Sequence, residues 1–176
     1  FIFFTEKGPG AIHAPLWISL AAGLVVGGLA QYSRLCMVGG IRDIILFKET
    51  KLILGFIAIL VAAFLVNISV GNFHPGFVKQ PIAHTDGLWN FLGMALAGFC
   101  SVLLGGCPLR QLIMTGEGNS DSAVTVLGLA AGAAFAHNFG LAASGAGPTL
   151  NGEIAVGVGF VVAFIIAVLN TKRSNA

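Results

Sequence analysis

Charged side chains are scarce in this sequence. Asp, Glu, Lys and Arg together make up 9% of its 176 residues, whereas a water-soluble domain carries about 25%. So few charges cannot cover a surface that faces water, and 56% of the residues are hydrophobic. The composition therefore excludes an ordinary soluble domain and indicates an integral membrane protein whose surroundings are the lipid bilayer.

Basic clusters, cysteine pairs and cofactor motifs are also missing. A net charge of +2 with no basic stripe excludes a nucleic-acid-binding protein. The three cysteines, Cys36, Cys100 and Cys107, lie in or beside apolar segments and cannot all pair, which argues against the disulfide framework of a small secreted protein. The loop histidines alone are too few for a metal site. We therefore expect neither a metal nor a cofactor.

The sequence instead contains long runs of apolar residues. A bilayer core about 30 Å thick needs roughly 20 apolar residues of helix. Five runs are long enough and predict spanning helices over residues 15–32, 52–71, 88–106, 122–143 and 153–170. The predicted fold is all-α: a polytopic transmembrane helical bundle that forms a single integral membrane domain over residues 1–176.

Two shorter segments, which follow the first and third runs, each contain a cysteine. They read "RLCMVGGIRDIILFKETK" and "CPLRQLIMTGEGNSD". Each opens on a semi-apolar stretch that is too short to span the bilayer and too apolar for a free loop. We therefore predict a short re-entrant or broken helix bearing a cysteine in each, buried in protein or lining a cavity.

The sequence also matches itself at an offset of 71 residues. Cys36 falls on Cys107 and Asn67 falls on Asn138, and both residue types are uncommon in this chain. The match predicts two internal repeats, the first over about 15–71 and the second over about 87–143, with an extra C-terminal span over about 153–170. Transporters are often built in this way, with the substrate site between the repeats. Whether the repeats are parallel or inverted stays open.

The stretch "GGCPLRQ", residues 105–111, predicts a site. Proline favours the first position of a helix, and the residue before it leaves the α region, so we expect Cys107 at the N-cap of a new short helix. The first N–H groups of that helix would then make an anion site beside the thiol, strengthened by Arg110. The alternative is a kink with an inert, buried cysteine and an arginine that reaches for the membrane interface.

The first repeat carries the related stretch "SRLCMVGGIRD", residues 33–43. There Arg34 and Arg42 flank Cys36, although Arg42 and Asp43 could also form a local charge cluster at the interface. His137 and Asn138 are polar residues inside the fourth run, where such side chains usually face a cavity or a neighbouring helix. The predicted substrate pathway is Arg34, Cys36, Arg42, Gly105, Gly106, Cys107, Arg110, Gln111, His137 and Asn138.

These motifs resemble the YeeE/YedE family of sulfur-transport membrane proteins, and they look most like its YedE-like branch of selenium transporters. The similarity covers roughly residues 20–170 and lies in "GLAQYSRLCMVGGIRD" and "GFCSVLLGGCPLRQ". It implies short helices that meet at the centre of a prokaryotic inner-membrane protein, where Cys36 and Cys107 hand an anion along by S–H···S hydrogen bonds. Full members are longer, so we expect the C-terminal half of a protein whose remainder is a partner.

The expected function is a membrane transporter or permease for a small sulfur- or selenium-containing anion, thiosulfate-like or a selenium species. Neutral thiols suit a passing anion better than thiolates, because fixed negative charge would repel it. The alternative is a membrane thiol or persulfide relay that delivers sulfur or selenium to a cytoplasmic carrier protein. No acid–base residue lies beside either thiol in the sequence, so we expect no catalytic residues and no enzyme.

Overall fold

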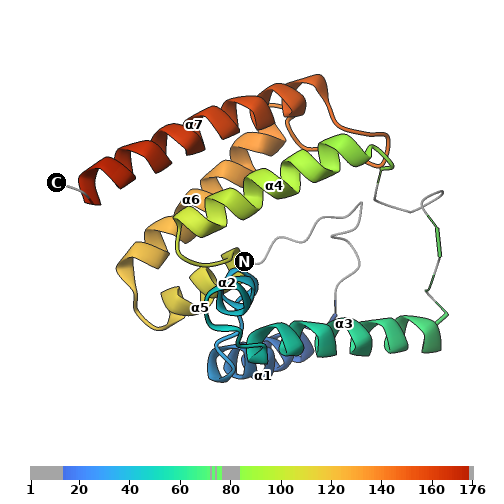
Figure 1. The fold of residues 1–176 in the computed structure, drawn as a ribbon. Coiled ribbons are helices and arrows are strands. Elements are labelled where there is room, and N and C mark those ends of the chain that lie inside the picture. Colours follow the sequence, from blue (N-terminus) through green and yellow to red (C-terminus); the bar gives the residue numbers. More distant parts are fainter. Residues whose placement is uncertain (1–13, 72, 74, 77–83, 175–176) are drawn as a thin grey trace. The chain divides into compact units, whose positions relative to one another are not determined.

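The protein is all-helical. The computed structural model describes residues 14–71, 73, 75–76 and 84–174, and every regular element within them is an α-helix (Figure 1). The predicted all-α fold is therefore confirmed. The chain divides into two compact units, residues 1–35 and 36–176, each of which is described by itself.

In the described part of the first unit, residues 14–35, the chain forms α1 (Leu16–Tyr32). Pro15 precedes it in an extended conformation, and the Pro15 carbonyl accepts a hydrogen bond from the Ser19 N–H at 3.0 Å. The helix ends in a turn where the Leu35 N–H donates to the Ala30 carbonyl and the Arg34 N–H to the Gln31 carbonyl. This pairing needs a left-handed residue, which glycine usually supplies. Arg34 takes that place with a φ of +50°.

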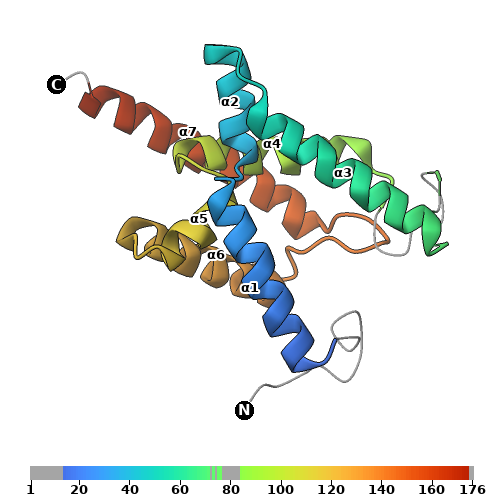
Figure 2. The ribbon, with the colours of Figure 1, turned by 90° about the horizontal axis from the view of Figure 1, so that it is seen from below.

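The described residues of the second unit form six helices. They are α2 (Met37–Phe47), α3 (Lys51–Ser69), α4 (Gly87–Leu103), α5 (Pro108–Gly116), α6 (Ser120–Asn138) and α7 (Leu150–Ser174). Helix α2 packs on α3 and α4 (Figure 2), α5 packs on α6, and α7 runs beside α4 (Figure 1). The two short helices, α2 and α5, each begin directly after a cysteine.

Small residues let these helices approach closely. A methyl group added at Gly40 of α2 would lie 3.4 Å from the backbone nitrogen of Ile53 in α3. One added at Gly159 of α7 would lie 2.6 Å from the Leu96 side chain in α4. Close approach through glycine is typical of helices that pack in a membrane, where van der Waals contact rather than water exclusion drives association.

Apolar surface dominates the outside of the helices. Trp17 is 77% exposed, and α3 has no buried residue. By length and composition, four segments of the described residues can cross a membrane: Leu16–Phe47, Lys51–Ser69, Gly87–Gly116 and Leu150–Thr171. The chain is thus a multi-pass membrane protein.

Helix α6 differs from the prediction of five membrane crossings. It has 19 residues but is not among the four candidate spans. Its middle is rich in alanine and glycine, and its ends are polar, with Asp121 at one end and His137 and Asn138 at the other. Small side chains contribute less to the transfer of a helix into lipid than leucine or valine do. The fifth crossing stays a prediction.

The helix bounds repeat along the chain. Helix α4 begins and ends 71 residues after α1, and α5 begins 71 residues after α2. Gly105, 71 residues after Arg34, has a φ of +73° and closes α4 with the same two hydrogen bonds that close α1, made by the Gly105 and Gly106 N–H groups. The internal repeat itself remains a prediction, to which these shared bounds and turns lend support.

Candidate functional site

Cys36 is the N-cap of α2. Its backbone is extended (φ −151°, ψ 117°), and its sulfur accepts a hydrogen bond from the Gly39 N–H at 3.3 Å. The residue is 7% exposed. A methyl group at Gly39 would lie 3.4 Å from the Cys36 Cβ and 3.5 Å from its Sγ, so the missing side chain leaves the sulfur room. The thiol is thus fixed at the start of the helix, with an N–H group aimed at it.

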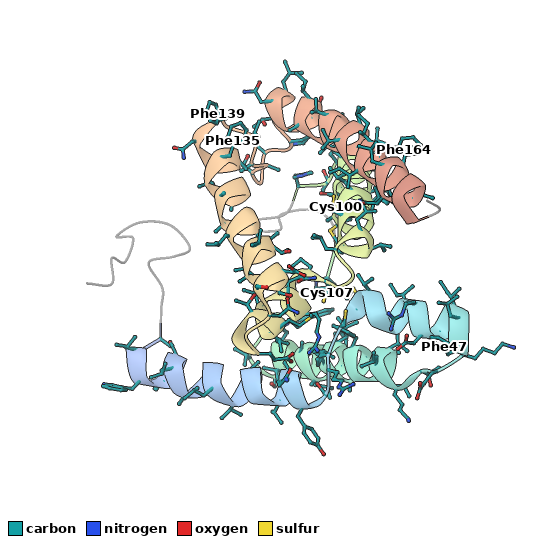
Figure 3. The ribbon with its side chains drawn as sticks, turned by 90° about the vertical axis from the view of Figure 1, so that its left-hand side faces the viewer. Phe47, Cys100, Cys107, Phe135, Phe139 and Phe164 are labelled. Atoms are coloured by element: carbon teal, nitrogen blue, oxygen red, sulfur yellow. The ribbon has the colours of Figure 1, made fainter. Side chains whose placement is uncertain are left out.

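Cys107 is the N-cap of α5, as the Cys-Pro sequence predicts. Its backbone is extended (φ −68°, ψ 162°), and Pro108 takes the first helical position. Unlike the sulfur of Cys36, its side chain makes no capping hydrogen bond with its own helix. The half-buried Cys107 thiol is therefore available to groups outside α5 (Figure 3).

The structure brings the two cysteines together. The sulfur of Cys36 lies within hydrogen-bonding reach of the Cys107 thiol and of the Cys107 backbone N–H, and it also faces the Val38 and Gly39 N–H groups. The starts of α2 and α5 therefore meet at one pair of thiols. The unpaired N–H groups of a helix start carry partial positive charge, so two such starts make the surroundings of these sulfurs electropositive.

Gln111 holds the turn that leads into α5. Its side chain is buried, at 4% exposed, and its Nε2 donates to the Leu104 carbonyl at 2.9 Å. That carbonyl belongs to the end of α4, where helix geometry leaves acceptors without partners. Gln111 thus fixes the segment that contains Gly105 and Gly106. Its amide therefore holds Cys107 in position and does not point into open space.

Arg42 and Arg110 each lie beside a carboxylate. Arg42 donates to Asp43 from Nε at 3.0 Å and from Nη2 at 2.9 Å, with 60% of the Arg42 side chain exposed. Arg110 Nη1 lies 3.4 Å from Glu117 Oε1, with side chains 20% and 34% exposed. The carboxylates offset the positive charge that the sequence predicts for the pathway, so the helix starts and not the arginines supply most of the local positive field.

Glu117 is the residue that the sequence reasoning missed. It follows Arg110 by seven residues, which is about two helical turns and places both on one side of α5. That spacing was the available signal. The pair draws the Arg110 guanidinium along α5 toward its C-terminal end, away from Cys107 at its start.

Arg42 also borders a cavity between α2 and α4. The cavity has a volume of about 540 Å³ and is lined by Arg42, by Gly39 one turn earlier, by Gly98, Val102 and Gly105 of the α4 side, and by apolar residues of α2. It therefore adjoins both cysteine-bearing turns through Gly39 and Gly105. The charge cluster of Arg42 and Asp43, expected as an alternative, is present and lies at this cavity.

The other predicted pathway residues are not gathered at the thiols. Arg34 belongs to the first unit. His137 and Asn138 are exposed near the end of α6, between Phe135 and Phe139, and Figure 3 shows that end far from Cys107. The Asn138 Nδ2 donates to the Ala134 carbonyl in its own helix at 2.8 Å. Their part in a pathway stays a prediction.

Cys100 occupies a separate place. It lies in α4 and borders an apolar groove of about 1260 Å³ between α4, α6 and α7, together with Leu96, Phe135 and Phe139 (Figure 3). The surroundings of Cys100 in this groove are apolar. In the part of the chain that the structure describes, no three His, Cys, Asp or Glu side chains gather where they could hold a metal ion.

The comparisons with known proteins place the chain in a family. A family model described as Sulphur transport matches residues 32–172, which is most of the chain and includes both cysteine-bearing turns. No curated protein and no solved structure matches it. The protein is therefore a membrane protein with a sulfur-transport role, and the chain belongs to the sulfur-transport family, the YeeE/YedE family that its cysteine motifs resemble.

Proposed function

We propose that the paired thiols of Cys36 and Cys107 form the narrow point of a passage for a small sulfur- or selenium-containing anion, with thiosulfate as the first candidate. The observation that carries this proposal is the meeting of two helix starts at one pair of cysteines. It combines N–H groups, which favour an anion, with sulfurs, which suit a soft and polarisable solute.

The charge balance favours passage over tight binding. An anion in the bilayer would lose several kcal/mol of hydration unless donors replace its water. The Cys107 thiol, which makes no capping hydrogen bond with its own helix, is such a donor, and the positive ends of α2 and α5 add their dipoles. Because carboxylates offset the charge of Arg42 and Arg110, the site lacks the deep electrostatic well that would trap an anion. Favourable entry with weak retention is what conduction requires.

The thiols act in this proposal as neutral S–H groups. Each can donate a weak hydrogen bond to the anion and accept one from its neighbour. Cys36 is buried and Cys107 is half-buried, so the anion would meet Cys107 first when it comes from the more exposed side. A hydroxyl can replace a thiol in this role, whereas a methyl group cannot.

A second candidate is a persulfide relay, which the contact between the two sulfurs also permits. A sulfane sulfur on one cysteine could pass to the other and then to a carrier protein in the cytoplasm. Serine separates the two functions, because a hydroxyl donates hydrogen bonds but cannot carry a sulfane sulfur. The prokaryotic inner membrane and the remainder of the full-length protein belong to both proposals.

Uptake of labelled thiosulfate and selenite into vesicles that hold the full-length protein tests the proposal. We expect Cys107→Ala to lower thiosulfate uptake by about ten- to a hundredfold, since a hydrogen bond to a charged group contributes roughly 1.5–3 kcal/mol. Cys107→Ser should retain part of the uptake, and the matched control Cys100→Ser should retain all of it. Full uptake by Cys107→Ala would refute the passage, and a total loss in Cys107→Ser would favour the relay.

A further inference from the structure

We propose that Cys36 and Cys107 are a reversible modification site: mild oxidants convert this thiol pair to an intramolecular disulfide that joins the starts of α2 and α5. The proposal rests on the contact between the two sulfurs. The Cys36 sulfur lies within hydrogen-bonding reach of the Cys107 thiol, and both thiols are free in the reduced protein. Neither thiol is a ligand in a cluster of three metal-binding side chains among the described residues.

The backbone at both cysteines permits the short approach that a disulfide needs. A disulfide brings two sulfurs to about 2.0 Å and two Cβ atoms to about 3.5–4.5 Å. Both cysteines are N-caps with extended backbone, and their carbonyls accept the first hydrogen bonds of α2 and α5, from the Gly40 and Gln111 N–H groups at 2.8 and 3.1 Å. Cys107 also follows Gly105 and Gly106, and a methyl group at Gly105 would meet nothing within 4 Å. Open space therefore lies beside Gly105, whereas a methyl group at Gly106 would lie 3.4 Å from the Arg110 Cγ.

The difference in exposure between the two thiols determines which of them is oxidised first. Peroxide reaches Cys107, the more exposed thiol, and its sulfur takes one oxygen from the peroxide to give a sulfenic acid and one water. The Cys36 sulfur then attacks the Cys107 sulfur, the S–S bond forms, and the hydroxyl leaves as a second water with the proton from Cys36. The two thiols supply two electrons, and the peroxide is the oxidant that accepts them.

Cys100 is excluded as the partner by its position. It lies along α4 at the apolar groove toward α7, whereas Cys107 lies at the start of α5 (Figure 3). A cysteine inside a helix also has less freedom to approach than an N-cap has. Oxidation should therefore select one pair among the three thiols of this chain.

The modification would stop the passage proposed above, on which this consequence rests. A disulfide removes both S–H donors and links α2 to α5 at the narrow point. The linked state would therefore carry no anion, and a reducing agent would restore transport. Formation of the disulfide itself does not depend on what the protein transports.

The test uses the full-length wild-type protein in detergent or vesicles, treated with hydrogen peroxide or diamide. Remaining thiols are alkylated, and the peptides are mapped by mass spectrometry with and without dithiothreitol. We expect Cys36 and Cys107 to lose alkylation together and to appear as one linked peptide, while Cys100 stays alkylated. Cys100→Ser should give the same link, and Cys36→Ser should leave Cys107 without a partner inside the chain.

Several results would overturn the proposal. They are continued alkylation of all three thiols at oxidant levels that oxidise glutathione, a link that includes Cys100, and a link between two copies of the chain. Uptake is measured in parallel and should fall at least about tenfold in the linked protein. A linked protein that still takes up thiosulfate would contradict the proposed passage but not the modification site, so the two failures are distinguishable.

Discussion

Removal of the Gln111 side-chain amide should loosen the junction between α4 and α5. Gln111 is 4% exposed, and its Nε2 donates to the Leu104 carbonyl at 2.9 Å, across seven residues of chain. Gln111→Met keeps the length and the approximate volume of the side chain and removes only the polar group. Any effect then reports the hydrogen bond and not a cavity.

The expected magnitude follows from burial. The bond is part-buried, because Gln111 is buried whereas Leu104 is 47% exposed, so its removal should cost about 1 kcal/mol, the average for an intramolecular hydrogen bond. For a chain of this size each kcal/mol shifts the melting temperature by roughly 2–4 °C. Gln111→Met should therefore lower the melting temperature of the detergent-solubilised protein by about 2–4 °C. Thiosulfate uptake should also fall, because Cys107 is no longer held in place.

Thermal unfolding of the solubilised protein, followed by intrinsic tryptophan fluorescence, measures this effect. Asn90→Ala is the matched control, because the Asn90 Nδ2 also donates to a backbone carbonyl, that of His84 at 3.2 Å, but from an exposed position. The control should shift the free energy of unfolding by no more than about 0.5 kcal/mol. Equal melting temperatures for wild type and Gln111→Met would refute the role given to this amide.

Two further substitutions test the turn and the ion pair of α5. Gly105→Ala should lower the free energy of unfolding by about 1–2 kcal/mol, because Gly105 has a φ of +73°. Gly98→Ala, inside α4 and with nothing within 4 Å of the added methyl group, should leave the free energy of unfolding unchanged or raise it slightly. Equal thermal unfolding of the two variants would contradict this. Glu117→Gln removes the carboxylate that lies 3.4 Å from Arg110 and should lower the KM for a divalent anion in uptake assays, while Glu49→Gln, which breaks an exposed pair with Lys51, should leave it unchanged. An unchanged or higher KM in Glu117→Gln would show that Arg110 does not act on the anion.

The sequence predicted the helices well because their signal is local. Apolar runs, Pro15 and the Gly-Gly-Cys-Pro stretch placed the starts of α1 and α5, and the predicted 15–32 run agrees with α1 (Leu16–Tyr32). The third run ended three residues too late, at residue 106 instead of Leu103. Gly105 and Gly106 look apolar in a hydropathy count, yet they form the turn that closes the helix.

The site was predicted only in part because its contacts are tertiary. The N-cap place of Cys107 follows from the proline after it, a neighbour in the sequence. The proximity of Cys36 and Cys107 could be predicted only from their equivalent positions in the repeat. The role of Gln111 as a donor to Leu104 depends on the conformation of the turn between α4 and α5, whereas the pairing of Glu117 with Arg110 follows the seven-residue spacing that the sequence contains. The hydrophobic pattern of the sequence predicts neither of these two contacts.

Protection of the thiols by substrate tests the central claim most directly. The full-length protein is alkylated with a slow maleimide in the presence of rising thiosulfate, with sulfate at equal ionic strength as the control, and the modification of each cysteine is followed by mass spectrometry. The account predicts that thiosulfate slows alkylation of Cys107 and Cys36 and leaves Cys100 unchanged. Alkylation of all three at the same rate with and without thiosulfate, in protein that transports it, would contradict the account.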